Sequence, residues 1–102
     1  MERFYKMAEA ADKRFPEGVE PFQMLARLLE ECGEVAKEVN HFEGSGIKLQ
    51  KYGAPSKEKL ANEIRQAAVA LFQLAKHYSV ENELEQAIEA SLQRSRAEGL
   101  IE

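Results

Sequence analysis

A single amphipathic stretch in the first half of the chain does most to limit what this sequence can fold into. Between positions 22 and 42, apolar residues recur every three or four positions, which places them along one side of an α-helix. This apolar side comprises Leu25, Leu28, Leu29, Cys32, Val35, Ala36, Val39 and Phe42. Glu31 lies at its edge, and Glu34 follows one turn later, slightly farther outward. Because residues three apart are neighbours on a helix surface, the two carboxylates are expected to converge on one ligand.

Three other segments show a helical period as well, and no convincing strand pattern occurs in the sequence. We expect helices over residues 2–14, over residues 57–78 with Ser56 as the N-cap, and from an N-cap at Ser79 to about position 98. The inner face of the last helix is predicted to consist of Leu84, Ala87, Ile88, Ser91 and Leu92. The sequence therefore predicts one domain, residues 1–102, with an all-α fold of four helices packed as a bundle.

The connection between the second and third helices, residues 43–55, is long for a compact domain. It contains three glycines and a proline, and its apolar residues show only weak periodicity. Long loops of this kind are often functional or mobile, so we expect residues 44–53 to be the most mobile interior segment. Lys48 and Lys51 in this loop are candidates for contact with phosphates, although solvated lysines are the simpler interpretation.

The third predicted helix points to association between chains. Its middle, residues 67–72, is apolar on all sides, and a chain of 102 residues encloses only a modest core. A heptad-like seam runs along it through Leu60, Ile64, Ala67, Leu71, Leu74 and Tyr78. We therefore expect a homo-oligomer, either a homodimer or a dimer of dimers, with Leu71 on a buried seam.

Composition excludes several kinds of partner. The formal net charge of -4 argues against duplex nucleic acid or an anionic membrane as the main partner, but not against a small phosphate ligand held through a metal. No apolar run approaches the length of a membrane span, and no signal-peptide pattern opens the chain. Cys32 is the only cysteine, which fits a reducing cytoplasm, and its place on the apolar side predicts a core residue rather than a nucleophile.

A second, partial carboxylate pair is expected on the helix over residues 57–78. Glu63 borders its apolar seam, and Gln66 follows three residues later on the same side. If this helix packs antiparallel to the one before it, both residues face Glu31 and Glu34. Three carboxylates and one amide oxygen would then suit Mg²⁺ or Mn²⁺, which prefer oxygen ligands.

Two other interpretations of these residues stay open. A glutamate-rich segment in a charged helix often serves only to keep that face solvated. Glu38 and His41 have the E-x-x-H spacing of di-iron bundles, but such sites need the motif on two helices, and His77 has Leu74 where a glutamate should stand.

The two carboxylate motifs resemble those of the MazG-type all-α nucleoside triphosphate pyrophosphohydrolases. Residues 30–34 are similar to the E-E-x-x-E motif of that family, and residues 63–66 to its E-x-x-D motif, with glutamine in the last place. The resemblance extends from about Phe22 to Arg96. It implies a MazG-like four-helix bundle that hydrolyses a nucleoside triphosphate to the monophosphate and pyrophosphate with Mg²⁺, or Mn²⁺ in its place, as cofactor.

The resemblance also implies roles for single residues. The metal ligands would be Glu31, Glu34 and Glu63, with Gln66 in place of an aspartate, and Glu30 would support the site as a further catalytic residue. The carboxylates are thus the implied catalytic and metal-binding set.

The last helix of the family offers a lysine, an asparagine and an arginine to the triphosphate. Here Ser91 and Ser95 stand at the first two places, and Arg96 is kept as a candidate for nucleotide binding. Two alternatives therefore remain beside the enzyme: a catalytically impaired nucleotide-binding or protein-interaction module of the same fold, and a structural helical oligomer.

Overall fold

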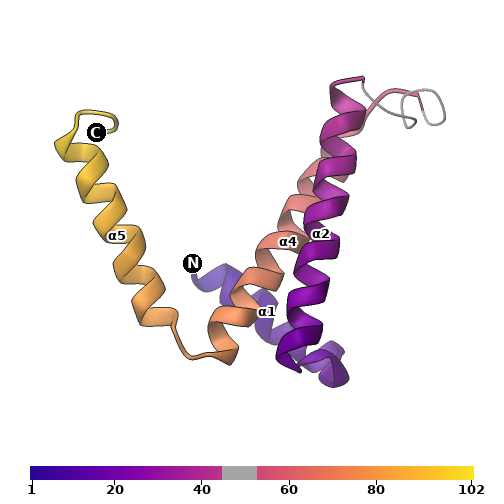
Figure 1. Cartoon of the computed structure of the whole chain (residues 1–102), viewed down its shortest axis with the longest axis horizontal. Coiled ribbons are helices and arrows are strands. Elements are labelled where there is room, and N and C mark those ends of the chain that lie inside the picture. The colour runs from indigo at the N-terminus through magenta and orange to yellow at the C-terminus, as the bar shows by residue number, and fades with distance from the viewer. Residues whose placement is uncertain (45–52) are drawn as a thin grey trace.

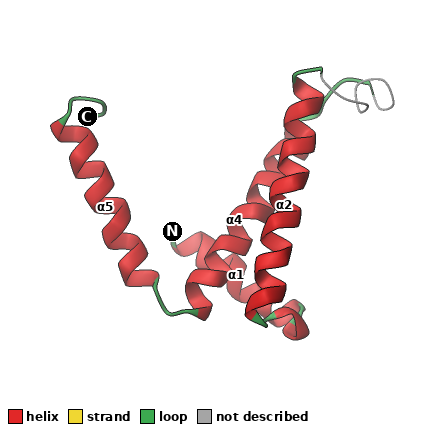
Figure 2. Ribbon diagram, in the orientation of Figure 1, coloured by secondary structure: helices red, strands yellow, loops and turns green. Residues whose placement is uncertain are grey.

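The computed structural model describes residues 1–44 and 53–102, and this part of the chain is entirely helical (Figures 1 and 2). No strand occurs in the described residues, so the all-α fold predicted from the sequence is confirmed. The elements in chain order are α1 (Glu2–Arg14), the short 3-10 helix η1 (Pro16–Gly18), α2 (Pro21–Phe42), α4 (Lys57–His77) and α5 (Glu81–Ala97).

Local capping explains where the helices begin. Ser56 is the N-cap of α4, as predicted, and its Oγ accepts a hydrogen bond from the backbone nitrogen of Lys59 at 3.2 Å. The predicted cap at Ser79 is wrong, because Ser79 has φ 55° and belongs to the turn that ends α4. Val80 is the N-cap of α5 instead, without a side-chain hydrogen bond.

Three of the helices form the packed part of the molecule. α2 and α4 lie side by side in opposite directions, and α1 crosses α4 (Figure 1). The ring of Phe72 on α4 lies between those of Phe4 and Tyr5, each with its centroid 4.9 Å away. The buried apolar residues are Ala8, Met24, Val69, Ala70 and Ala75.

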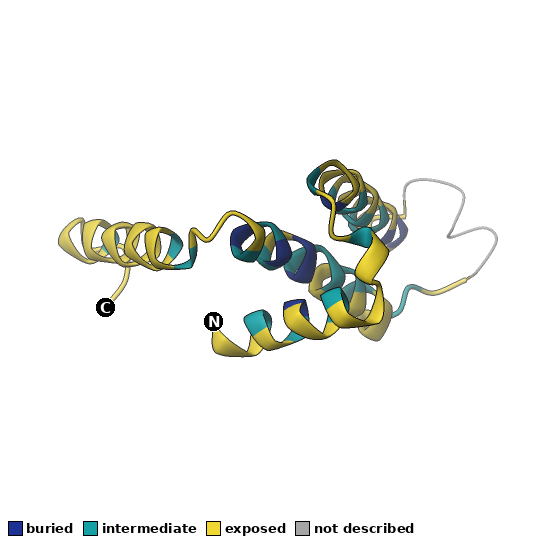
Figure 3. Ribbon diagram, turned by 90° about the horizontal axis from the view of Figure 1, so that it is seen from below, coloured by how far each residue is buried: buried dark blue, intermediate teal, exposed yellow. Residues whose placement is uncertain are grey.

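The fourth helix does not complete a bundle within the chain. α5 contains no buried residue and leads away from α4 after the turn that joins them (Figures 1 and 3). Its predicted inner face is therefore largely exposed, with Ile88 and Leu92 each 36% accessible. The physical reason is that α4 directs its buried residues toward α1 and α2, which leaves α5 little to pack against.

The residues of α2 that are buried are not the ones at the centre of its predicted apolar side. Met24, Glu38 and His41 are buried, whereas Leu25, Leu29 and Val39 keep 45%, 66% and 44% of their surface exposed. Cys32 is exposed as well, so the prediction that it lies in the core is wrong. The apolar side is simply wider than the contact with one neighbouring helix can cover.

The predicted seam on α4 is likewise open in the single chain. Ile64, Leu71 and Tyr78 are 51%, 54% and 60% exposed, because Val69 and Ala70 take the buried positions. Leu71 is therefore not buried within the described single chain, and its burial on a seam between chains stays a prediction.

Part of the loop between α2 and α4 lies outside the described residues. Lys48, Lys51 and most of the segment 44–53 fall within residues 45–52, outside the described residues. Within residues 1–44 and 53–102, none of the helices combines the length and apolar composition that crossing a bilayer requires.

The same substitution at two places on α4 tests this packing. Ala70 is 2% exposed, so Ala70→Asp should lower the free energy of unfolding by at least about 3 kcal/mol, because the charge would be buried without a partner. Ala61, which is exposed on the same helix, is the matched control. Ala61→Asp should change the free energy of unfolding by less than about 0.5 kcal/mol. Urea unfolding followed by circular dichroism measures both, and equal effects would contradict the assigned face of α4.

Candidate functional site

A pocket of about 390 Å³ lies where α1, α2 and α4 meet. Three arginines, one from each helix, contribute to its lining together with apolar side chains and other polar residues. Its polar residues include Arg14, Arg27, Arg65, Glu31 and Gln66, and its apolar residues include Met7, Phe15 and Val69. Such a lining suits a ligand that carries both negative charge and a flat apolar part.

At this pocket, the Gln66 amide joins two carboxylates from different helices. With its nitrogen facing them, Gln66 on α4 donates hydrogen bonds to Oε2 of Glu31 on α2 at 2.7 Å and to Oε2 of Glu63 at 3.2 Å. The opposite orientation would place the amide oxygen against two acceptors, so the nitrogen is assigned to this side. The side chains of Glu31, Glu63 and Gln66 therefore form one cluster, which contains three of the four residues that the sequence placed together and does not include Glu34.

The environment of Glu31 disfavours its charged form. Partial burial raises the pKa of Glu31 above its ordinary value, and the carboxylates of Glu63 and Glu34 raise it further, while Arg27 acts in the opposite direction. Burial and neighbouring carboxylates thus both favour the protonated form of Glu31.

The remaining residues of the first motif lie farther from this centre. Glu34 is half-buried, and its Oε1 accepts from Nζ of Lys37 at 3.3 Å, while Glu30 is exposed. Within the described part of the chain, no three Glu, Asp, His or Cys side chains lie in positions that would hold a metal ion together. Any ion here would depend on Glu31, Glu63 and an oxygen from Gln66, with Glu34 reaching it only after leaving Lys37.

The structure does not bring Arg96 to the carboxylates within one chain. Arg96 lies on α5, where Nη1 is 3.9 Å from Oε1 of Glu89 and Nε donates to the carbonyl oxygen of Glu102 at 3.2 Å. Ser91 and Ser95 lie on the same helix, which leads away from the pocket (Figure 1).

A buried polar network that the sequence did not reveal supports the pocket. Nη2 of Arg27 donates to Oε1 of Gln73 at 2.6 Å, and Nε2 of Gln73 donates to Oδ1 of Asp12 at 2.8 Å. Nζ of Lys76 lies 3.4 Å from Oδ2 of the same aspartate. Gln73 is 2% exposed and connects α1, α2 and α4. A glutamine between apolar residues was the only signal available in the sequence.

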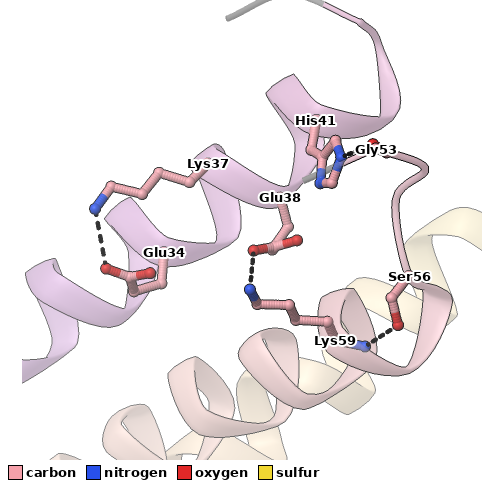
Figure 4. A network of polar contacts seen from close by, with 7 residues as sticks. All are labelled: Glu34, Lys37, Glu38, His41, Gly53, Ser56 and Lys59. Atoms are coloured by element: carbon pink, nitrogen blue, oxygen red, sulfur yellow. Dashed lines mark hydrogen bonds and ion pairs between the residues drawn. The ribbon is translucent and has the colours of Figure 1, made fainter. Parts of the chain in front are cut away.

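A second polar network joins the C-terminal end of α2 to the beginning of α4 (Figure 4). Oε1 of the buried Glu38 lies 3.7 Å from Nζ of Lys59, and Nε2 of His41 is 2.6 Å from the carbonyl oxygen of Gly53. Because a carbonyl only accepts, Nε2 of His41 carries the proton. Both residues of the E-x-x-H spacing are therefore engaged in contacts between segments, which gives no support to a di-iron site.

Comparison of the chain with family models, with curated proteins and with solved structures gives no match. The likeness to MazG-type enzymes therefore depends on the residues of the two carboxylate motifs themselves.

Replacing Gln73 tests the network beneath the pocket. Gln73→Leu keeps the approximate volume but leaves Arg27 and Asp12 without their shared partner, so it should destabilise the fold by roughly 2–3 kcal/mol. Gln93→Leu, on the exposed surface of α5, serves as the control and should have little effect. Thermal unfolding of both variants compares them, and similar melting temperatures would contradict a structural role for the network.

The raised pKa of Glu31 predicts a stability that depends on pH. A carboxyl group whose pKa is higher in the folded state costs stability when it ionises, so the cost is absent below the ordinary glutamate pKa and complete above the raised one. Glu31→Gln should therefore stabilise the fold at neutral pH by roughly 0.5 kcal/mol. This gain should vanish as the pH falls below the ordinary pKa of glutamate.

Glu30→Gln is the matched control, because Glu30 is exposed and contributes least among the causes of the Glu31 shift. Unfolding curves at neutral and acid pH measure the difference in the free energy of unfolding between each variant and the unchanged protein. A gain from Glu31→Gln that persisted unchanged in acid would show that carboxylate repulsion is not its cause.

Proposed function

We propose that this chain binds a nucleoside triphosphate with a divalent cation and hydrolyses it to the monophosphate and pyrophosphate. The observation that carries the proposal is the meeting of a carboxylate cluster and three arginines at one pocket. Carboxylates attract Mg²⁺ or Mn²⁺, and arginines attract the phosphates that such a cation accompanies. The single cysteine agrees with a cytoplasmic location, which is part of the same proposal.

The residues present fit a small divalent cation as a set of oxygen donors. Glu31 and Glu63 already share one polar hydrogen-bond donor, and rotation of the Gln66 amide by half a turn would offer its oxygen in place of its nitrogen. Glu34 would join them as a fourth ligand. When bound, Mg²⁺ would neutralise phosphate charge and make the phosphorus a better electrophile.

The other side chains of the pocket would bind and orient the substrate. Arg27 is held by Gln73 and lines the pocket, where its remaining N–H groups and those of Arg65 would bind phosphate oxygens. Phe15 lines the same pocket and is 55% exposed, so its ring is available to a nucleobase.

The Gln66 amide favours a second candidate, nucleotide binding without turnover. Its nitrogen occupies the position between Glu31 and Glu63 and bonds to both, which neutralises part of the repulsion that a cation would otherwise relieve. A chain of this kind would keep the fold and the arginine-lined pocket but bind the cation weakly.

Two measurements separate these candidates. Pyrophosphate release is screened across common and modified nucleoside triphosphates with Mg²⁺ or Mn²⁺, and calorimetry follows the binding of Mg²⁺ with a non-hydrolysable triphosphate. Release that is abolished by Glu63→Gln and retained by Glu43→Gln, an exposed glutamate at the end of α2, supports the enzyme. Binding without release supports the second candidate, and the absence of both leaves only a structural oligomer.

Position 66 provides the sharpest test of the shared site. Gln66→Asp removes the two hydrogen bonds and adds a fourth carboxylate, so it should bind Mn²⁺ several-fold more tightly and raise any pyrophosphate release. The same variant should be less stable without metal, because the carboxylates repel one another. Glu34→Gln should change both quantities in the opposite direction.

Gln66→Asn is the neutral control, since it shortens the side chain without adding charge. Manganese titration and thermal unfolding measure all three variants. If Gln66→Asp leaves both Mn²⁺ affinity and turnover unaltered, Glu31, Glu63 and position 66 do not share one metal site.

A further inference from the structure

The single chain exposes far more surface than a folded protein of its mass normally does. Its accessible surface is 7518 Å², against roughly 5,800 Å² expected for a monomer of 11.5 kDa. Its radius of gyration is 16.7 Å, against about 13 Å for a compact chain of this length. The excess of about 1,700 Å² per chain is the area that a stable dimer buries in an obligate interface.

An apolar groove lies at the elbow where α4 turns into α5. It has a volume of about 400 Å³, and its walls are almost entirely apolar. We call it the elbow groove; it is lined by Leu71, Phe72, Leu74, Ala75, Tyr78, Val80, Leu84 and Ile88. Beyond it, α5 continues with exposed apolar residues and no helix of the described chain beside them (Figure 3).

We propose that α5 of a second copy of this chain lies antiparallel against α5 of the first, across a two-fold axis. The occupant is a second copy because the sequence of α5 complements itself in this orientation, in both size and charge. The inference goes beyond the proposed nucleotide chemistry and does not depend on it.

The apolar positions of α5 pair large residues with small ones when the helix is placed antiparallel to itself near position 89. Leu84 then lies opposite the partner's Ser95, Ile88 opposite the partner's Ser91, and Leu92 opposite the partner's Ala87. All three pairs follow from one register, and all six residues share one side of the helix. Large residues facing small ones allow two helices to approach closely and interdigitate.

The charges of α5 agree with the same register. Its first half is acidic and its last turn is basic, so an antiparallel pair brings opposite charges together at both ends. Glu83 and the partner's Arg94 meet along one flank of the apolar side, and Glu85 and the partner's Arg96 meet along the other. A parallel pair would instead place the four glutamates of each first half side by side.

The end of the chain supplies the occupant of the elbow groove. After α5, Gly99 has φ 76°, and the following Leu100 and Ile101 are 71% and 43% exposed. In the antiparallel register, the C-terminal end of the partner's α5 comes beside the beginning of α5, next to the groove. Two-fold symmetry fills both grooves in the same way, which closes the assembly as a dimer.

A charge exchange in the full chain tests the arrangement. One variant combines Arg94→Glu with Arg96→Glu, and the other combines Glu83→Arg with Glu85→Arg. Each alone places like charges opposite each other at four positions, so its apparent dissociation constant should rise at least about tenfold, with partial recovery at high salt. An equimolar mixture restores every opposite-charge pair and should form a heterodimer, seen by sedimentation and by native mass spectrometry.

Glu17→Arg with Glu43→Arg is the matched control for the Glu83→Arg, Glu85→Arg variant, since it makes the same change in net charge at exposed residues away from α5. It should sediment as the unchanged protein does, as a dimer at micromolar concentration. A monomeric unchanged protein would overturn the proposal. A dimer that both α5 variants retain would also overturn it, and so would two disrupted variants that fail to associate when mixed although circular dichroism shows each to be helical.

Discussion

The placement of α4 between α1 and α2 is the constraint on which the rest of the structure depends. Gln73 fixes this placement, because a buried amide must find partners and its two partners come from the two neighbouring helices. An apolar residue there would allow α4 to rotate or slide among several similar packings. With Gln73 bonded to Arg27 and Asp12, α4 presents Glu63 and Gln66 to α2 and leaves Leu71 outward.

The rotation of α4 about its own axis determines which residues it presents on each of its two sides. On one side it gathers carboxylates and arginines at a pocket that an anionic ligand can enter. On the other side it leaves an apolar seam and the elbow groove without a covering element among the described residues. The pocket is lined by three helices of one chain, whereas the seam and α5 have no such neighbours among the described residues. The proposed ligand site and the proposed contact between copies thus lie on opposite surfaces of the same helix.

Local features of the sequence predicted the helices well. The features that the sequence did not predict depend on contacts between residues far apart in the chain. Ser56 caps α4 as expected because a cap involves only residues three positions apart. The partners of Gln73 lie 46 and 61 positions away, and no local pattern identifies them. The apolar side of α2 is wide enough to meet α4 in more than one way, so the sequence alone did not show that Cys32 would be exposed. The candidate site was predicted in part for a similar reason: spacing placed Glu31 near the second motif, but the orientation of the Gln66 amide depends on the folded surroundings.

The hydrogen bonds of Gln66 make cation binding an exchange rather than a simple addition. An ion that enters between Glu31 and Glu63 must first displace an amide nitrogen that bonds to both at 2.7 and 3.2 Å. The heat released by the new contacts is then offset by the bonds that are broken, and the side chain must turn before its oxygen can take part. An ion whose hydration water is lost at lower free-energy cost would compete better with these bonds, whereas Mg²⁺ gives up water reluctantly. The site would therefore discriminate among divalent cations by the cost of dehydration as well as by their size.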